Sequence, residues 1–163
     1  MKLKNLIAAV LVPAMLLTGC GSDDPQAGAG ETADVEPTEI VNAVLAEIPI
    51  TSGIEKGRDD IDDFYSDIDV SQVESASFAL CASGAYPDEI AVMRCADDSA
   101  AAGVKAAFEK RLASQSELFS TYTPDEMYKL DTAKIYTVGC YAVFIALSDN
   151  DRARDIVDGK LSD

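Results

Sequence analysis

The 163-residue chain contains no histidine and no tryptophan, and 29 acidic residues outnumber its 13 basic ones. The absence of histidine excludes Ser-His-Asp and Cys-His catalysis as well as histidine-based zinc sites. The formal charge of −16 leaves too few Lys and Arg for dense phosphate contacts, so we expect no nucleic-acid partner. Hydrophobic residues nevertheless make up 48% of the chain, which is enough to form a core.

The N-terminus is typical of an exported protein. Lys2 and Lys4 precede an apolar run over residues 6–17, which has the length of a secretory signal and is too short for a transmembrane helix. The Leu-Thr-Gly-Cys sequence of residues 17–20 resembles the bacterial lipobox. This resemblance implies a signal peptide over residues 1–19 and a lipid on Cys20 that anchors the chain to the cell membrane. The alternative is an ordinary signal peptide followed by a coincidental cysteine.

Residues 20–36 are small, polar and acidic and show no hydrophobic period. We therefore expect a flexible tether there, followed by a single folded domain over residues 37–163. Residues 20–74 hold 15 acidic and 2 basic residues, so most of the negative charge lies near the expected anchor. Anionic headgroups would repel this segment and hold the domain away from the membrane.

The hydrophobic pattern of the domain predicts helices and strands in the order α-β-β-α-β-β-α. The expected helices are residues 37–48, 98–122 and a last one capped by Ser148, and the expected strands are residues 73–82, 89–95, 132–138 and 141–147. Asp98 or Ser99 is the expected cap of the long helix. Residues 53–57 are expected to be a loop, and Gly139-Cys140 a tight hairpin turn. This order predicts an α+β fold of two layers, with a four-stranded, mainly antiparallel sheet from two hairpins covered by helices.

Four features of the domain resemble one known family when taken together. They are the GAYPDEIAV segment of residues 84–92, the long helix after residues 97–98, the Tyr-Thr-Pro sequence of residues 122–124, and the Gly139 hairpin. They resemble the bacterial lipoproteins of domain-of-unknown-function family 4358, over about residues 60–160. The resemblance implies a cell-surface lipoprotein and brings no activity, substrate, cofactor or catalytic residue. Cys140 departs from it, because a polar residue is expected at that turn position, so we expect Cys140 to be exposed.

Three cysteines besides Cys20 lie within the domain: Cys81, Cys95 and Cys140. Cys81 and Cys95 differ by several residues in the expected hairpin register, which is too far for a disulfide. A bridge from Cys140 to either depends on where the second hairpin lies, which the sequence leaves open. No Cys-x-x-Cys pair supports a redox role. We expect three reduced thiols, with one bridge or one functional thiol as the alternatives.

Acidic residues are the other candidates for chemistry. Residues 59–69 hold six aspartates, a composition that suits Ca²⁺, but EF-hand spacing fails because Gln72 and Phe78 occupy the positions of the required Gly and Glu. We interpret this stretch as a solvated acidic surface and predict no metal. Three carboxylate pairs, at residues 88–89, 97–98 and 125–126, could serve a glycosidase, but we expect them to face water or helix N-termini. We therefore predict no catalytic residue, no cofactor and no enzyme.

The candidate interaction loop is Tyr86, Pro87 and Asp88, because an exposed aromatic beside a rigid proline suits partner recognition. The alternative is that Tyr86 packs over the sheet edge and Pro87 only fixes the turn. The expected function is a lipid-anchored extracytoplasmic module that binds an envelope protein. A small-ligand or solute-capture lipoprotein with a single-domain pocket is the alternative. The sequence does not predict the oligomeric state.

Overall fold

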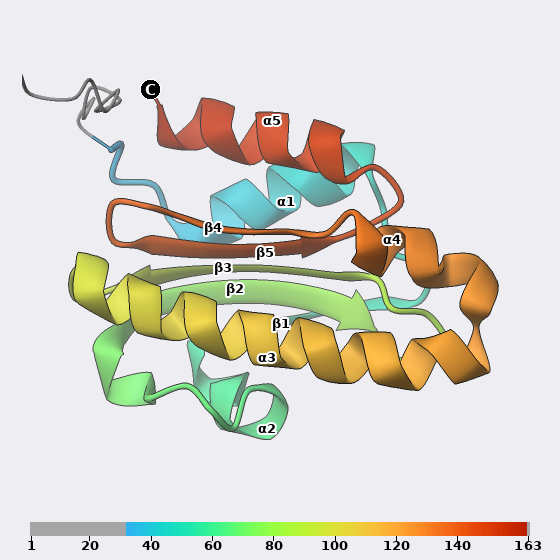
Figure 1. Ribbon diagram of the computed structural model, residues 1–163. Helices are drawn as coiled ribbons and strands as arrows, with labels where there is room; N and C mark the ends of the chain where they lie inside the picture. Colours follow the sequence, from blue (N-terminus) through green and yellow to red (C-terminus); the bar gives the residue numbers. More distant parts are fainter. Residues whose placement is uncertain (1–31, 163) are drawn as a thin grey trace, which may run out of the picture.

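The structure is a computed structural model, and it describes residues 32–162 (Figure 1). The expected signal peptide, the expected lipid-bearing Cys20 and residues 20–31 of the expected tether lie outside the described residues. Among the helices of residues 32–162, none is long and apolar enough to cross a membrane.

Strands and helices follow one another along residues 32–162 and build one sheet with helices packed on it. The elements are α1 (Pro37–Glu47), β1 (Gly53–Gly57), α2 (Ile61–Phe64), β2 (Val73–Cys81), β3 (Glu89–Cys95), α3 (Asp98–Tyr122), α4 (Met127–Asp131), β4 (Lys134–Val138), β5 (Tyr141–Ala146) and α5 (Asn150–Leu161). The α+β class is confirmed, and β3 and α3 have the bounds that the sequence predicts.

The sheet has five strands in the order β1-β2-β3-β5-β4, and every neighbouring pair is antiparallel. The expected four-stranded sheet is therefore wrong. The additional strand is β1, expected to be a loop, which pairs with β2 from Gly53 opposite Cys81 to Gly57 opposite Ser77. Its five residues, GIEKG, hold one apolar side chain between two glycines, so no alternation marks them as a strand. Pairing with β2 decides their conformation.

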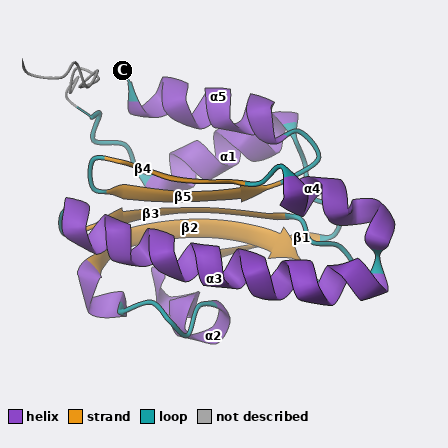
Figure 2. Cartoon of the chain, in the orientation of Figure 1, coloured by secondary structure: helices purple, strands orange, loops and turns teal. Residues whose placement is uncertain are grey.

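Helices cover both faces of the sheet, so the expected two-layer arrangement is also wrong (Figure 2). One core lies between the sheet and α1 with α5, and includes Ile40, Val44, Val143, Ile145 and Val157. The other lies between the sheet and α3 with α2, and includes Ile61, Phe78, Met93, Phe108 and Phe144. The physical reason is that β3 and β5 are apolar on both faces, and each face must be shielded from water.

The second hairpin has the form that the sequence predicts. Val138 pairs with Tyr141 across a two-residue turn in which Gly139 has a φ of +51°, a backbone conformation that glycine adopts without strain. The prediction that β5 is a central strand is confirmed, since it lies between β3 and β4. Cys140 is half-buried rather than fully exposed.

The helix boundaries correct three details of the prediction. Asp97, rather than Asp98 or Ser99, caps α3, because its carboxylate accepts a hydrogen bond from the Ala100 amide at 2.8 Å. Asp149, rather than Ser148, caps α5 by accepting from the Arg152 amide at 3.0 Å. The short helix α4 was not expected at all.

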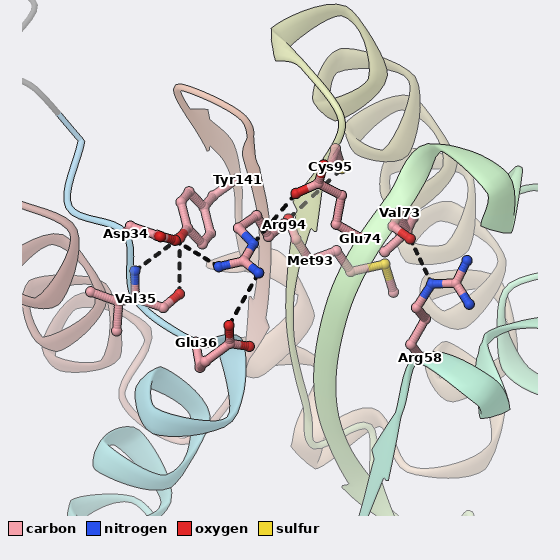
Figure 3. Close-up of polar contacts among 10 residues, drawn as sticks. All are labelled: Asp34, Val35, Glu36, Arg58, Val73, Glu74, Met93, Arg94, Cys95 and Tyr141. Atoms are coloured by element: carbon pink, nitrogen blue, oxygen red, sulfur yellow. Dashed lines mark hydrogen bonds and ion pairs between the residues drawn. The ribbon is translucent and has the colours of Figure 1, made fainter.

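Residues 32–36, which the composition assigns to the tether, lie against the sheet in an arrangement that we call the latch (Figure 3). The Tyr141 hydroxyl accepts from the Val35 amide at 3.0 Å and donates to the Val35 carbonyl at 2.9 Å. The Arg94 guanidinium forms ion pairs with Asp34 at 2.6 Å and Glu36 at 3.1 Å. The folded part therefore begins at least five residues before the expected boundary at residue 37.

Candidate functional site

A cleft of about 460 Å³ lies where β2 ends and β3 begins, between α2 and the second half of α3. Its walls combine aromatic, aliphatic and polar side chains. They come from Phe64, Tyr65, Ser66, Asp67, Leu80, Cys81, Gly84, Tyr86, Pro87, Asp88, Glu89, Ala107, Lys110, Arg111, Ser114, Gln115, Leu118 and Phe119. The cleft therefore joins three segments that are distant in sequence, within residues 64–67, 80–89 and 107–119.

The floor of the cleft is organised around Glu89, which is only 1% exposed. Arg111 binds both of its carboxylate oxygens, with Nε 2.6 Å from Oε1 and the second guanidinium nitrogen 2.7 Å from Oε2. The Tyr65 hydroxyl donates to Oε1 at 2.5 Å, and the Gln115 amide donates to Oε2 at 2.7 Å. This set satisfies the buried carboxylate, as a buried charge requires.

The electrostatics of the floor keep its donors protonated. Burial, together with the neighbouring Glu89 carboxylate, raises the pKa of Tyr65 well above its ordinary value. Burial acts to lower the pKa of Arg111, but the hydrogen bonds and charge of Glu89 outweigh burial and raise it. Gln115 brings one free hydrogen-bond acceptor to the cleft, because its Oε1 is buried and has no hydrogen-bond partner among the described residues. A bound molecule can donate a hydrogen bond to that oxygen.

Lys129 of α4 fixes the loop that borders the cleft. Its ammonium group lies 2.7 Å from Asp88 and 2.6 Å from Glu126. Burial acts to lower the pKa of Lys129, but these two carboxylates raise it, so the side chain stays charged. The same ammonium lies 5.7 Å from the centre of the Tyr86 ring and 5.8 Å from that of Tyr128, within the range of cation–π attraction.

The predicted interaction loop is thus part of the cleft, but its three residues differ in environment. Tyr86 is 41% exposed, whereas Pro87 and Asp88 are buried. The expectation that the acidic pair at residues 88–89 faces water is wrong, because Asp88 is buried against Lys129 and Glu89 against Arg111. Gly84 makes the loop possible, since its φ of +63° suits glycine and its amide donates to the Cys81 carbonyl at 3.1 Å.

Four large hydrophobic side chains of residues 32–162 are exposed, and two of them, Tyr86 and Leu118, line this cleft. The four are Tyr86, Leu118, Tyr122 and Tyr128, which we call the rim. Leu118 and Tyr122 are four residues apart on α3 and so share one helix face. Tyr86 and Tyr128 both lie against the Lys129 ammonium. Tyr122, which the helical period assigns to the packed face of α3, is 75% exposed.

The exposed charges between Leu112 and Asp131 are all acidic, whereas Lys110, which lines the cleft, is an exposed basic residue. Glu117, Asp125 and Asp131 are exposed on α3, on the segment after it and on α4. The single basic residue between Leu112 and Asp131 is Lys129, which is buried and paired with carboxylates. The rim therefore combines apolar side chains with an acidic surround.

Cys81 lies in the wall of the cleft, with Sγ 3.3 Å from the Ser83 hydroxyl. Burial acts to raise the pKa of the Cys81 thiol, but hydrogen bonds from the Ser83 hydroxyl and from the loop amides of Ser83, Ala85 and Tyr86 outweigh burial and lower it. The expectation that Cys81 and Cys95 are too far apart for a bridge is confirmed, because β2 and β3 place them at opposite ends of the sheet.

The aspartates of residues 59–69 are engaged separately rather than as one cluster. Asp60 accepts from the Lys56 ammonium at 2.9 Å and from the Gly57 amide at 3.1 Å. Asp69 accepts from the Ser71 amide at 3.0 Å, and Asp67 lies 3.4 Å from the Lys110 ammonium. Within residues 32–162, no group of three or more acidic or cysteine side chains is arranged to hold a metal ion.

The residues that organise the floor were missed by reasoning from the sequence. One signal was available, because Glu89 occupies the same strand face as Ala91 and Met93, which are buried. An acidic side chain on a buried face requires a partner, and Arg111 and Gln115 are four residues apart on one face of α3. The sequence does not reveal which helix covers that face.

Comparison with known families assigns most of the chain to one family. A family model described as a domain of unknown function, DUF4358, matches residues 50–147, which is more than half of the chain. The chain belongs to the DUF4358 family. The matched residues of this DUF4358 protein include the whole sheet, the cleft and the rim, whereas α1 and α5 lie outside them. Nothing among the curated proteins or the solved structures matches the chain.

Proposed function

We propose that this DUF4358 protein is a lipid-anchored, extracytoplasmic binding module that recognises an envelope protein through the rim and the adjoining cleft. The proposed anchor is a lipid on Cys20, and the proposed role is non-catalytic. One observation carries the proposal: all exposed large hydrophobic side chains of the described residues gather at one end of the domain. Exposed apolar side chains concentrated in one place are typical of interaction surfaces.

The position of the rim supports this role. The latch fixes residues 32–36 beside Tyr141 and Arg94, at one end of the sheet. The cleft lies at the other end, beside Glu89, where β3 begins. Cys95 follows Glu89 by six residue steps along β3, a distance of roughly 20 Å. A domain that is attached at the latch end presents the rim away from its anchor (Figure 1).

The chemistry of the rim favours a basic segment of a partner protein. Tyrosine rings attract Lys and Arg side chains, and the exposed carboxylates around them attract the same charges. Apolar side chains of such a segment can enter the cleft between Leu118 and Phe119 of α3 and Phe64 of α2. The buried Gln115 Oε1 can then accept a hydrogen bond from the segment.

The size of the cleft favours a second candidate, the capture of a small ligand. A volume of about 460 Å³ lies within the range of roughly 300–1,000 Å³ that is usual for ligand pockets. The charged side chains that line it pair with one another, which fits a neutral molecule that carries a hydrogen-bond donor.

Crosslinking in living cells tests the proposal. A photoreactive residue at position 122 or 128 of the full chain is expected to capture the same envelope protein. A photoreactive residue at Asp155, exposed on α5, is the matched control and should not capture it. Random neighbours at all three positions would contradict partner recognition. Native mass spectrometry of the purified chain, with a bound small molecule that is lost on Gln115→Leu, would instead support ligand capture.

The anchor has its own test. Radioactive palmitate should label the full chain in its native host and should leave Cys20→Ala unlabelled. Labelling of the Cys20→Ala chain would refute the lipid attachment, whatever the outcome at the rim.

A further inference from the structure

The fold brings together two cysteines that the sequence leaves unconnected. The ladder between β3 and β5 ends with the pair Arg94 and Tyr141, and the next residues outward are Cys95 and Cys140. The contact is direct, because the Cys95 amide donates a hydrogen bond to the Cys140 carbonyl at 2.8 Å. The turn of the second hairpin therefore lies against the end of β3.

The backbones at these two positions are close enough for a cross-strand disulfide to be considered. Residues opposite one another in antiparallel strands have Cα atoms about 4.5–5.5 Å apart, and disulfides join Cα atoms that are roughly 4.4–6.8 Å apart. Cys81 cannot replace either residue, because it follows Leu80, which pairs with Glu89 at the far end of β3. All three cysteines in the described residues are free thiols in the structure, and of them only Cys95 and Cys140 occupy adjoining positions.

We propose that Cys95 and Cys140 form a disulfide bond that ties the β4–β5 turn to the end of β3, and that Cys81 remains a free thiol. The half-buried Cys140 reacts first: its thiolate attacks a disulfide supplied by an envelope oxidoreductase or by glutathione disulfide, and one thiolate leaves. Cys95 then loses its proton and attacks the Cys140 sulfur, which releases the second thiolate. The two protein thiols lose two protons and two electrons, and the oxidant disulfide becomes two thiols.

The surroundings of the pair fit a buried, stable bridge. Cys95 is 1% exposed, and burial, with smaller contributions from Cys140, Asp97 and Glu74, raises the pKa of its thiol to about 12. A thiol with so little thiolate is slow to react with external reagents, and a bridge at this position is shielded from reductants. Cys140 occupies a tight turn, where a water-facing residue is usual, and its half-buried side chain packs at the edge of the core beside α1 and α5.

The bridge would lie at the latch, where it is most useful. Arg94, which holds Asp34 and Glu36, is the neighbour of Cys95, and Tyr141, which holds Val35, is the neighbour of Cys140. A covalent link here prevents β3 and β5 from separating at the end where the tether joins. Only its formation in the cell rests on the proposed export, since export supplies an oxidising compartment.

Peptide mapping tests the pairing directly. The full chain is isolated without reductant, incubated with glutathione disulfide, alkylated in denaturant at acidic pH and digested with trypsin. Cleavage after Lys and Arg places the three thiols on different peptides, residues 59–94, 95–105 and 135–152. We expect peptide 95–105 to be linked to peptide 135–152, and Cys81 to be alkylated. Alkylation of both Cys95 and Cys140, or a bridge that includes Cys81, would overturn the proposal.

Thermal unfolding gives a second readout with matched variants. Reduction should lower the melting temperature of the wild-type chain by roughly 5–15 °C. The Cys140→Ser chain should show no such dependence on reductant, whereas Cys81→Ser should retain it. Equal melting temperatures for the oxidised and reduced wild-type chain would also refute the bridge. Because glutathione disulfide acts on the purified chain, these tests are independent of where the protein resides and of what the rim binds.

Discussion

The two ends of the sheet use charged and aromatic side chains in opposite ways. At the latch end, Arg94 and Tyr141 bind the chain's own residues 34–36, so the Val35 backbone and the two carboxylates of that segment have partners within the domain. At the rim end, the ion pairs of Asp88 and Glu89 are buried, and tyrosines face the solvent. The comparison shows that one end holds its own chain, while the other has exposed apolar surface available for a second molecule.

The largest expected effect comes from the floor of the cleft. Glu89→Ala would leave the half-buried Arg111 without its partner, and removing one partner of a largely buried ion pair costs up to about 3–5 kcal/mol in the free energy of unfolding. Urea denaturation measures the change. Glu109→Ala is the matched control, because its ion pair with Lys105 is exposed and should contribute about 0.5 kcal/mol or less. Similar losses for the two variants would mean that the floor does not hold the rim end together.

The next effect concerns the latch. Tyr141→Phe removes the hydroxyl that binds both the amide and the carbonyl of Val35, and should cost about 1 kcal/mol of stability. Hydrogen exchange at the Val35 amide should become faster, because the bond that protects it is lost. Tyr136→Phe on β4 is the control, since its hydroxyl does not contact residues 32–36. Unchanged exchange at Val35 in Tyr141→Phe would show that the latch does not depend on this hydroxyl.

Substitutions in the rim should weaken the binding of a partner and leave the free energy of unfolding nearly unchanged. Leu118→Ser with Tyr122→Ser removes exposed side chains, so the free energy of unfolding should change by no more than about 0.5 kcal/mol per substitution. Binding to a partner captured from position 128 should weaken at least about tenfold. A large loss of stability would mean that these side chains pack within the fold. Unchanged binding would place the partner elsewhere.

The smallest effect is expected at Asp60, which belongs to neither end. Its hydrogen bonds with Lys56 and Gly57 lower the pKa of this carboxyl below 3.8. A lowered pKa adds stability that is fully present above about pH 3.8 and is lost as the pH falls through the folded-state value. The wild type and Asp60→Asn should therefore differ slightly at pH 7 and converge near pH 2 in urea denaturation. A difference that grows on acidification would contradict this sign.

The sequence predicts those elements whose own residues carry a complete signal. The helix α3 has a cap, a long apolar period and a terminating Thr-Pro, and β5 is apolar on both faces, so both are placed correctly. The strand β1 and the helix α4 are short and lack a period, because pairing with β2 and the contacts of Lys129 and Leu130 decide their structure. Such tertiary effects cannot be derived from local pattern.

The same contrast applies to the site. Tyr86 is found from its turn context, whereas Arg111 and Gln115 read as ordinary polar residues of a long helix. Their role depends on which face of α3 covers Glu89, and that is decided by the packing of the whole layer. The one available indication of this role is the Glu89 carboxylate on a buried strand face. Because Glu89 is adjacent to Asp88, the two residues read instead as an exposed acidic pair.

The latch also gives the segment that precedes the domain two lengths, one with the latch closed and one with it open. Residues 32–36 are docked on the sheet by a few hydrogen bonds and ion pairs, so their release requires no unfolding of the strands or helices. Five residues of extended chain span about 17 Å. A pull on the N-terminal segment would first open these contacts and lengthen the connection by about that distance, with the sheet and the rim intact. The domain can thus move away from its N-terminal segment, toward a bound molecule, before the force acts on its strands and helices.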